Sequence, residues 1–361
     1  MVVELSDPGR SLLNTKSLKP SCVRHHRGAR PGRVCDDGRM PTVPPRAVAP
    51  SAPPASSALG HALLIAGDRW NLQIVRAVFD GSERFAQLRD ELGISDAVLS
   101  QRLGRLIDDG ILDAHPYSIA PPRNEYRLTA LGNDLWLAFV ALWNWDRQWA
   151  PRAPDRAVTQ LHHLTCGYVI TPVFGCGGCQ AIGVTARDVR TEVDAPLLVD
   201  VADRRSRRTA KSDAPGMDSS SMLADRWSTF LLAAALEGNR RFGDFQDRLG
   251  PISPVTLTDR LAHFVDNGML VRTPIVDGAR RQEYRTTPKS LGFFPVFAAL
   301  NAWAARHLSE DGRSGLTIVH KAGGHPLEPR YTCNACNAEL LRTETEFRQP
   351  IQRGLASESR E

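Results

Sequence analysis

Cysteine and histidine residues gather at two places in the 361-residue sequence, with the spacing of metal ligands. The two groups are His163-x-x-Cys166 with Cys176-x-x-Cys179, and His320 and His325 with Cys333-x-x-Cys336. Tetrahedral Zn²⁺ takes four nitrogen or sulfur ligands, and a Cys-x-x-Cys on a tight turn offers two thiolates at a suitable separation. Each group therefore predicts one zinc site that is closed by its own four residues, giving up to two Zn²⁺ per chain.

The two predicted sites differ in their ligands. The first is a Cys₃His site, in which His162 is an alternative to His163. The second carries Gly323 where Cys166 stands in the first, so His325 must supply its fourth ligand. Reduced free thiols or a redox pair are the alternative interpretation. Four protein ligands leave no open coordination position, which is typical of a structural metal.

The elements that position these ligands form a repeat. The second Cys-x-x-Cys follows the first by 157 residues, and similar offsets, 157 before the extra Pro251 and 158 after it, relate several other motifs. These are Asp68-Arg69-Trp70 with Asp225-Arg226-Trp227, Arg84-Phe85 with Arg241-Phe242, and Glu125-Tyr126-Arg127 with Glu283-Tyr284-Arg285. The chain therefore holds two copies of one two-part unit.

Within a copy, apolar residues spaced as on one helix face predict an amphipathic helix over 69–80. A short helix follows and ends at Gly93, and Ser95 is a suitable N-cap for a third helix that ends at Gly110. A β-rich segment to Leu128 reads as a hairpin, and Thr129 begins a last helix. This order predicts an α+β fold with two winged helix-turn-helix domains in tandem, each followed by a small β-rich, zinc-ribbon-like module.

The third helix of each copy buries one face and leaves the other to enter a DNA major groove. Arg123, at the hairpin tip, is placed to reach a phosphate or the minor groove. The candidate DNA-binding residues are Asp96, Ala97, Ser100, Gln101, Arg105 and Arg123 in the first copy, and Pro254, Val255, Thr258, Asp259, His263, Arg280 and Arg281 in the second.

Several linked motifs resemble the HxlR-type winged helix transcriptional regulators, over residues 58–150 and more loosely over 222–308. They are Gly67-Asp68-Arg69-Trp70, Arg84-Phe85-x-x-Leu88, Ile94-Ser95-x-x-x-Leu99-Ser100-x-Arg102-Leu103, Gly110-Ile111-Leu112 and Pro122-Arg123-x-Glu125-Tyr126-x-Leu128-Thr129-x-x-Gly132. The resemblance implies a bacterial, cytoplasmic DNA-binding regulator in which terminal helices pair two winged domains. It also strengthens the zinc prediction, since similar ribbons follow the winged domain in some actinobacterial relatives.

The chain departs from that family in two ways. Many members carry a cysteine just before the first helix, where this sequence has Ser57, so a thiol switch of that kind is not supported. Members are usually single-domain homodimers, whereas two unlike copies here predict an intramolecular pseudo-dimer that buries Trp143, Trp145 and Trp303. Its DNA half-sites should be unequal. Asp259 replaces Gln101, and it either selects cytosine or weakens non-specific binding. In another interpretation, the second copy has lost DNA contact and serves only in dimerisation.

The net charge of +5 does not indicate DNA binding. Residues 1–57 hold nine Lys and Arg against four Asp and Glu, and the remaining 304 residues hold 36 of each sign. The predicted organisation is a disordered basic, Pro-rich tail (1–57, with Met40 as an alternative start), winged domain 1 (58–150), zinc ribbon 1 (158–200), a linker (201–221), winged domain 2 (222–308), zinc ribbon 2 (316–348) and a disordered tail (349–361).

The leading functional prediction is a sequence-specific, cytoplasmic DNA-binding regulator, with repression as the expected output. Its predicted partners are an operator duplex with unequal half-sites and an unspecified small-molecule effector, with no membrane, and the chain acts as a monomeric pseudo-dimer or a homodimer. An enzyme fits poorly, because the sequence has neither a phosphate-binding glycine loop nor a G-x-S-x-G elbow. The alternative is a zinc-ribbon interaction module whose winged domains only dimerise, which predicts weak, salt-sensitive, sequence-independent DNA binding.

Overall fold

The computed structural model describes residues 57–119, 122–150, 159–194, 226–275 and 281–348. The predicted N-terminal tail up to residue 56, the linker 201–221, Arg280 and the C-terminal tail 349–361 lie outside the described residues.

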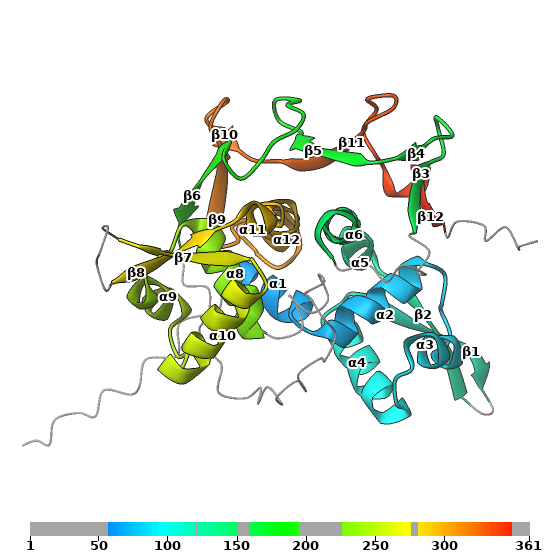
Figure 1. Cartoon of the computed structure of the whole chain (residues 1–361). Helices are drawn as coiled ribbons and strands as arrows, with labels where there is room; N and C mark the ends of the chain where they lie inside the picture. The colour runs from blue at the N-terminus through cyan, green and yellow to red at the C-terminus, as the bar shows by residue number, and fades with distance from the viewer. Residues whose placement is uncertain (1–56, 120–121, 151–158, 195–225, 276–280, 349–361) are drawn as a thin grey trace, which may run out of the picture. The chain divides into compact units, whose positions relative to one another are not determined.

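The first winged unit follows the predicted order of helices and strands (Figure 1). Its elements are α1 (Ala58–Ala66), α2 (Arg69–Phe79), α3 (Phe85–Leu92), α4 (Asp96–Asp108), β1 (Leu112–Ile119), β2 (Pro122–Leu128), α5 (Ala130–Asn133) and α6 (Trp136–Trp149). Helix α1 was not predicted, because it is apolar on almost every side and shows no clear periodicity. Ser57 caps this helix, since its Oγ accepts a hydrogen bond from the Gly60 amide at 3.0 Å.

The second winged unit repeats this order from the counterpart of α2 onward. Its elements are α8 (Arg226–Glu237), α9 (Phe242–Leu249), α10 (Pro254–Asp266), β7 (Leu270–Pro274), β8 (Gln282–Thr286), α11 (Pro288–Leu291) and α12 (Phe294–His307). The α+β fold with two winged helix-turn-helix units is therefore confirmed.

The two units pack on each other through α6 and α12, with α1 against α12. The indole Nε1 of Trp145 donates to the Lys289 carbonyl at 2.9 Å, and the indole Nε1 of Trp303 donates to the Leu131 carbonyl at 2.9 Å. Trp303 is the counterpart of Trp145 in the second copy, as Lys289 is of Leu131, and both indoles are buried. The same bond is thus made twice, in opposite directions, as in a two-fold symmetric dimer.

The segments that follow each winged unit form short strands. These are β3 (Gln160–His163), β4 (Val169–Ile170), β5 (Pro172–Cys176), β6 (Val189–Val193), β9 (Leu316–His320), β10 (His325–Pro326), β11 (Pro329–Cys333) and β12 (Thr345–Arg348), with a 3₁₀ turn η1 (Arg342–Glu344) before β12. They pair in the orders β12-β3-β4, β11-β5 and β10-β9-β6. Each of these three sheets therefore contains strands of both copies, and the structure differs from the prediction of two self-contained ribbons.

The pairing of β5 with β11 shows the relation between the copies most directly. The two strands are equivalent in sequence and run antiparallel, with Phe174 opposite Tyr331, its own counterpart. Their rings contact edge to face with centroids 5.5 Å apart. In Figure 1 the green β5 and the orange β11 lie side by side.

Candidate DNA interface and metal centres

Helix α4 separates into a buried and an exposed face, as predicted. Leu99, Leu103 and Leu106 are buried. The opposite face carries the candidate base-reading residues, of which Asp96, Ala97, Ser100 and Gln101 are exposed and Arg105 is half-buried. The side chains of this face are therefore available to a DNA groove.

The recurring Asp-Arg-Trp motif holds α4 against α2. The Asp68 carboxylate caps α2 by accepting from the Trp70 amide at 3.0 Å, and it also pairs with the Arg102 guanidinium at 2.9 Å. Asp68 and Arg102 both belong to the motifs that resemble the family, and their structural role is to fix the position of α4 against α2.

The wing is held by a second ion-pair network. Arg84 donates to Glu125 from Nε at 3.1 Å and from Nη2 at 3.0 Å, and Arg127 donates to the other carboxylate oxygen at 3.0 Å. The hydrogen bond from Arg84 is the main reason that the pKa of Glu125 lies below its usual value. The repeated motifs Arg84-Phe85 and Glu125-Tyr126-Arg127 therefore join the hairpin to the start of α3.

Arg123 lies exposed in β2, opposite Ser118 and next to the hairpin tip. No carboxylate of the described residues pairs with it, so its guanidinium is available for a phosphate. In the second copy, Arg281 is exposed beside the tip of the β7–β8 hairpin.

Helix α10 presents a different chemistry from α4. Its candidate residues Pro254, Val255, Thr258, Asp259 and His263 are all exposed, and none of them is a lysine or arginine. The Thr258 hydroxyl donates to the Pro254 carbonyl of its own helix at 2.8 Å. The two candidate reading surfaces are therefore unequal.

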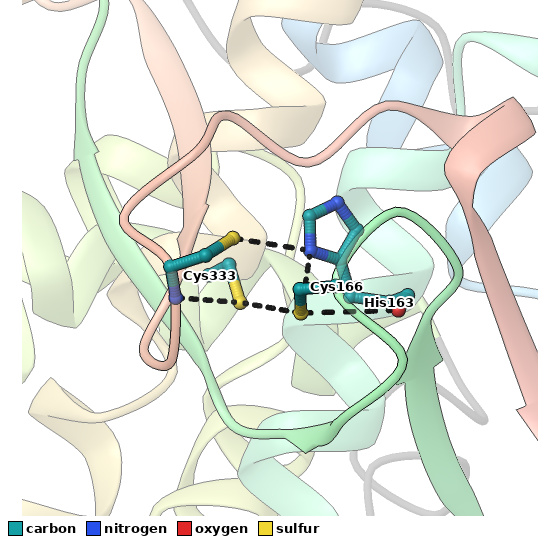
Figure 2. Close-up of side chains that lie close together, drawn as sticks. His163, Cys166 and Cys333 are labelled. Atoms are coloured by element: carbon teal, nitrogen blue, oxygen red, sulfur yellow. Dashed lines mark hydrogen bonds between the residues drawn. The ribbon is translucent and has the colours of Figure 1, made fainter.

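The first candidate metal centre comprises His163, Cys166, Cys333 and Cys336, whose possible ligand atoms all lie within 4.8 Å of one another. Figure 2 shows the His163 ring pointing into this cluster, with Cys166 and Cys333 beside it. His163 Nδ1 lies 3.2 Å from Cys166 Sγ and 3.4 Å from Cys336 Sγ, and the sulfurs of Cys166 and Cys333 are 3.8 Å apart. Tetrahedral Zn²⁺ requires about 3.6 Å between N and S ligands and about 3.8 Å between two sulfurs, so the cluster has the dimensions of a zinc site.

The second candidate metal centre comprises Cys176, Cys179, His320 and His325, whose possible ligand atoms again lie within 4.8 Å of one another. Cys179 Sγ lies 3.2 Å from His320 Nδ1. His325 Nδ1 lies 2.7 Å from the Pro326 carbonyl, and its buried Nε2 has no hydrogen-bond partner. A ring that donates from Nδ1 leaves Nε2 unprotonated and free to bind a metal, which is the usual arrangement of a histidine ligand.

The eight predicted ligands are all present in these clusters, but the prediction of how they group is wrong. His163 and Cys166 meet Cys333 and Cys336 of the second copy, whereas Cys176 and Cys179 meet His320 and His325. The reason is the antiparallel pairing of β5 with β11, which carries each Cys-x-x-Cys turn to the other copy's histidines. His162, the alternative ligand, lies outside both clusters, because neighbouring residues of β3 point to opposite faces.

The environment of Cys333 favours its thiolate. Burial disfavours the charged sulfur, but the backbone N–H groups of Cys336 and Ala335 point to it at 3.4 Å and outweigh that effect. The pKa of the Cys333 thiol falls to about 7. A thiol that ionises near neutral pH is ready to bind a cation, since the thiolate is the ligand form.

Comparisons with known proteins agree with this architecture. A model of the HxlR-like helix-turn-helix family matches residues 65–154 and again 222–312. The HTH-type transcriptional regulator Mb3122 of Mycobacterium bovis is 43% identical over 134 residues, which are 37% of this chain and 84% of that protein. The regulator YtfH of Escherichia coli is 38% identical over 21% of this chain and 62% of its own length. The crystal structure of PA1607 matches 38% of this chain and 94% of its own, at 27% identity and a TM-score of 0.32.

Two winged units, each with one exposed face on α4 or α10, define a helix-turn-helix DNA-binding protein. The chain belongs to the HxlR-like helix-turn-helix family, with two copies of the family domain in one polypeptide. It is a DNA-binding transcriptional regulator. Among the residues that the structure describes, no helix has the length and apolar character needed to cross a membrane.

Proposed function

We propose that α4 and α10 read the two unequal halves of one operator. The observation that carries this proposal is the contrast between their exposed faces, one with Gln101 and Arg105 and the other with Asp259 and His263. In the major groove a glutamine pairs with adenine, whereas a carboxylate accepts from the amino group of cytosine. Gln101 and Asp259 therefore favour different bases at equivalent positions of the two half-sites.

The wings supply phosphate contacts that carry no sequence information. Arg123 and Arg281 are exposed beside the hairpin tips and serve this role. Because one chain contains both reading helices, a single molecule suffices for one operator. Its place of action is the bacterial cytoplasm, where the chromosome lies.

Fluorescence anisotropy on DNA from the protein's own upstream region tests this proposal, with a shuffled duplex at the same salt concentration as reference. Gln101→Ala should cost about 1–3 kcal/mol on the preferred sequence and relax the base preference in one half-site only. Arg123→Ala should weaken binding evenly across sequences and lower the salt slope by about 1.

Arg313→Ala is the matched control, since it removes one exposed positive charge between α12 and β9, far along the chain from either wing. Wild-type protein that binds native and shuffled duplexes equally would contradict specific reading. Variants at Gln101 and Arg123 that behave like the control would contradict the roles of these residues.

We further propose that each metal centre binds one structural Zn²⁺. Four convergent ligands, tetrahedral spacing and the free Nε2 of His325 support this. His163 adds to it, because its Nδ1 lies 3.2 Å from Cys166 Sγ and 3.4 Å from Cys336 Sγ. Native mass spectrometry of the reduced protein should show two Zn²⁺ per chain. A chain without metal after purification in zinc would mean that the cysteines are reduced free thiols.

A further inference from the structure

Each metal centre takes two ligands from each copy of the repeat. The first joins the His163-x-x-Cys166 turn to the Cys333-x-x-Cys336 turn, and the second joins the Cys176-x-x-Cys179 turn to His320 and His325. A metal ion bound in either centre is therefore bonded to both halves of the pseudo-dimer. This is a consequence of the crossed geometry and would not hold for self-contained ribbons.

The strands around the centres also lie crosswise on the winged units. Phe347 of β12, at the end of the second copy, contacts Trp143 of the first with ring centroids 5.4 Å apart. Arg342 donates to the Phe79 carbonyl of α2 at 3.2 Å. In the opposite direction, Phe174 of the first copy contacts Phe294 of α12 at 5.9 Å. Each copy's strand segment thus covers the helices of the other copy.

The strands around the two centres are short. They contain two to five residues each and pair in sheets of two or three strands. Such small sheets are marginal in water without further support. In small modules of this kind the free energy of metal binding supplies the free energy of folding. Loss of metal should therefore release the contacts of Phe347, Arg342 and Phe174 with the opposite copy.

We propose that Zn²⁺ bound in the two crossed centres cross-links the copies. This cross-link holds the two reading helices together, so that they bind two half-sites simultaneously. This inference rests on the proposed zinc binding, and its DNA consequence rests on the proposed operator reading. When the two reading helices belong to one rigid body, binding of the first half-site raises the effective concentration of the second helix at the other half-site, which increases affinity. A loosened pair of helices loses most of this increase. Metal thereby controls operator affinity without contacting DNA.

The first test needs no DNA. A protease site is placed between residues 203 and 221, in the predicted linker, and the full chain is cut after purification with zinc. The two fragments should elute together from a size-exclusion column in Zn²⁺ and separate after treatment with 1,10-phenanthroline under reducing conditions. Addition of Zn²⁺ should restore co-elution. Fragments that stay together after mass spectrometry confirms metal loss would overturn the proposed metal cross-link, because the α6–α12 interface would then suffice to hold the copies together.

The second test uses the intact chain on a footprinted operator, on one half-site, and on an operator with about 5 base pairs inserted, which turns one half-site by half a helical turn. The zinc-loaded chain should prefer the native operator over either other duplex by about tenfold or more, and chelation should remove most of this preference. An unchanged preference in metal-free protein would overturn the proposal.

Cys166→Ser/Cys179→Ser, which breaks both centres, should match the chelated wild type in both tests. His162→Ala, which leaves both ligand sets intact, should match the loaded protein. If the zinc-loaded chain fails to distinguish any duplex from shuffled DNA, the proposed operator reading fails. The fragment experiment alone then decides whether metal cross-links the copies.

Discussion

Cys166→Ser combined with Cys336→Ser should leave one zinc ion per chain, whereas Cys166→Ser combined with Cys179→Ser should leave none. The first pair of changes falls within one crossed centre, and the second pair removes one ligand from each. Serine is nearly the size of cysteine but replaces a thiolate by a poor zinc ligand, so each affected centre should lose its metal. Native mass spectrometry counts the bound ions directly.

The opposite result would contradict the crossed arrangement. If the ribbons were separate, Cys166 and Cys179 would lie in the same ribbon, so the Cys166/Cys179 variant would keep one ion. Cys166 and Cys336 would lie in different ribbons, so the Cys166/Cys336 variant would keep none. Wild type and His162→Ala should both retain two ions. Each single cysteine variant should retain one, which establishes that the substitution itself does not unfold the chain.

His325→Ala should empty the second centre, and Gly323→Cys/His325→Tyr should refill it. A Cβ atom built on Gly323 would lie 2.3 Å from Cδ2 and 2.5 Å from Nε2 of His325, so the imidazole occupies the space that a cysteine at this position requires. In the first copy the counterparts are Cys166 and the exposed Tyr168. The double variant therefore copies the first centre's ligand pattern onto the second.

The loss should be large, because disruption of an outer-shell partner alone typically lowers metal affinity by about 10- to 100-fold, and His325→Ala removes a ligand itself. Competition with a chromogenic chelator measures both affinities. Gly323→Ser/His325→Tyr is the matched control and should stay at one ion, since it has the same shape without the thiolate. A double variant that also stays at one ion would show that a thiol at residue 323 cannot reach the metal.

The fold was predictable because its signals are local. Gly93 and Gly110 adopt positive φ angles where the second and third helices were expected to end, and the apolar period placed Leu99 and Leu103 inside. Ser95 is a weaker signal than expected, since its side chain makes no capping hydrogen bond, whereas its counterpart Ser253 accepts from the Thr256 amide at 3.1 Å.

The grouping of the metal ligands was not predictable from the same sequence. A repeat of 157 residues offers every Cys-x-x-Cys turn two equivalent ligand pairs, His163 with Cys166 in the first copy and His320 with His325 in the second. Spacing within one copy cannot distinguish these solutions. The choice depends on the antiparallel pairing of β5 with β11, a contact between residues far apart in the chain that leaves no local pattern. The ion pair of Asp68 with Arg102 was missed for the same reason.

The paired tryptophan bonds, from Trp145 to Lys289 and from Trp303 to Leu131, join two copies that belong to one polypeptide, so this pairing does not depend on protein concentration. The aligned region of the mycobacterial relative is 84% of that protein, which leaves room for one copy of the repeat and not for two. A chain with one copy can form such a pair only with a second molecule, so its pairing falls off on dilution. In this chain the two copies are translated together in a fixed one-to-one ratio, and the sequence of each copy has been free to diverge from the other. If the two copies read unequal half-sites, as proposed above, the operator has a direction, and inverting it in a promoter should exchange the positions of the two copies relative to the polymerase.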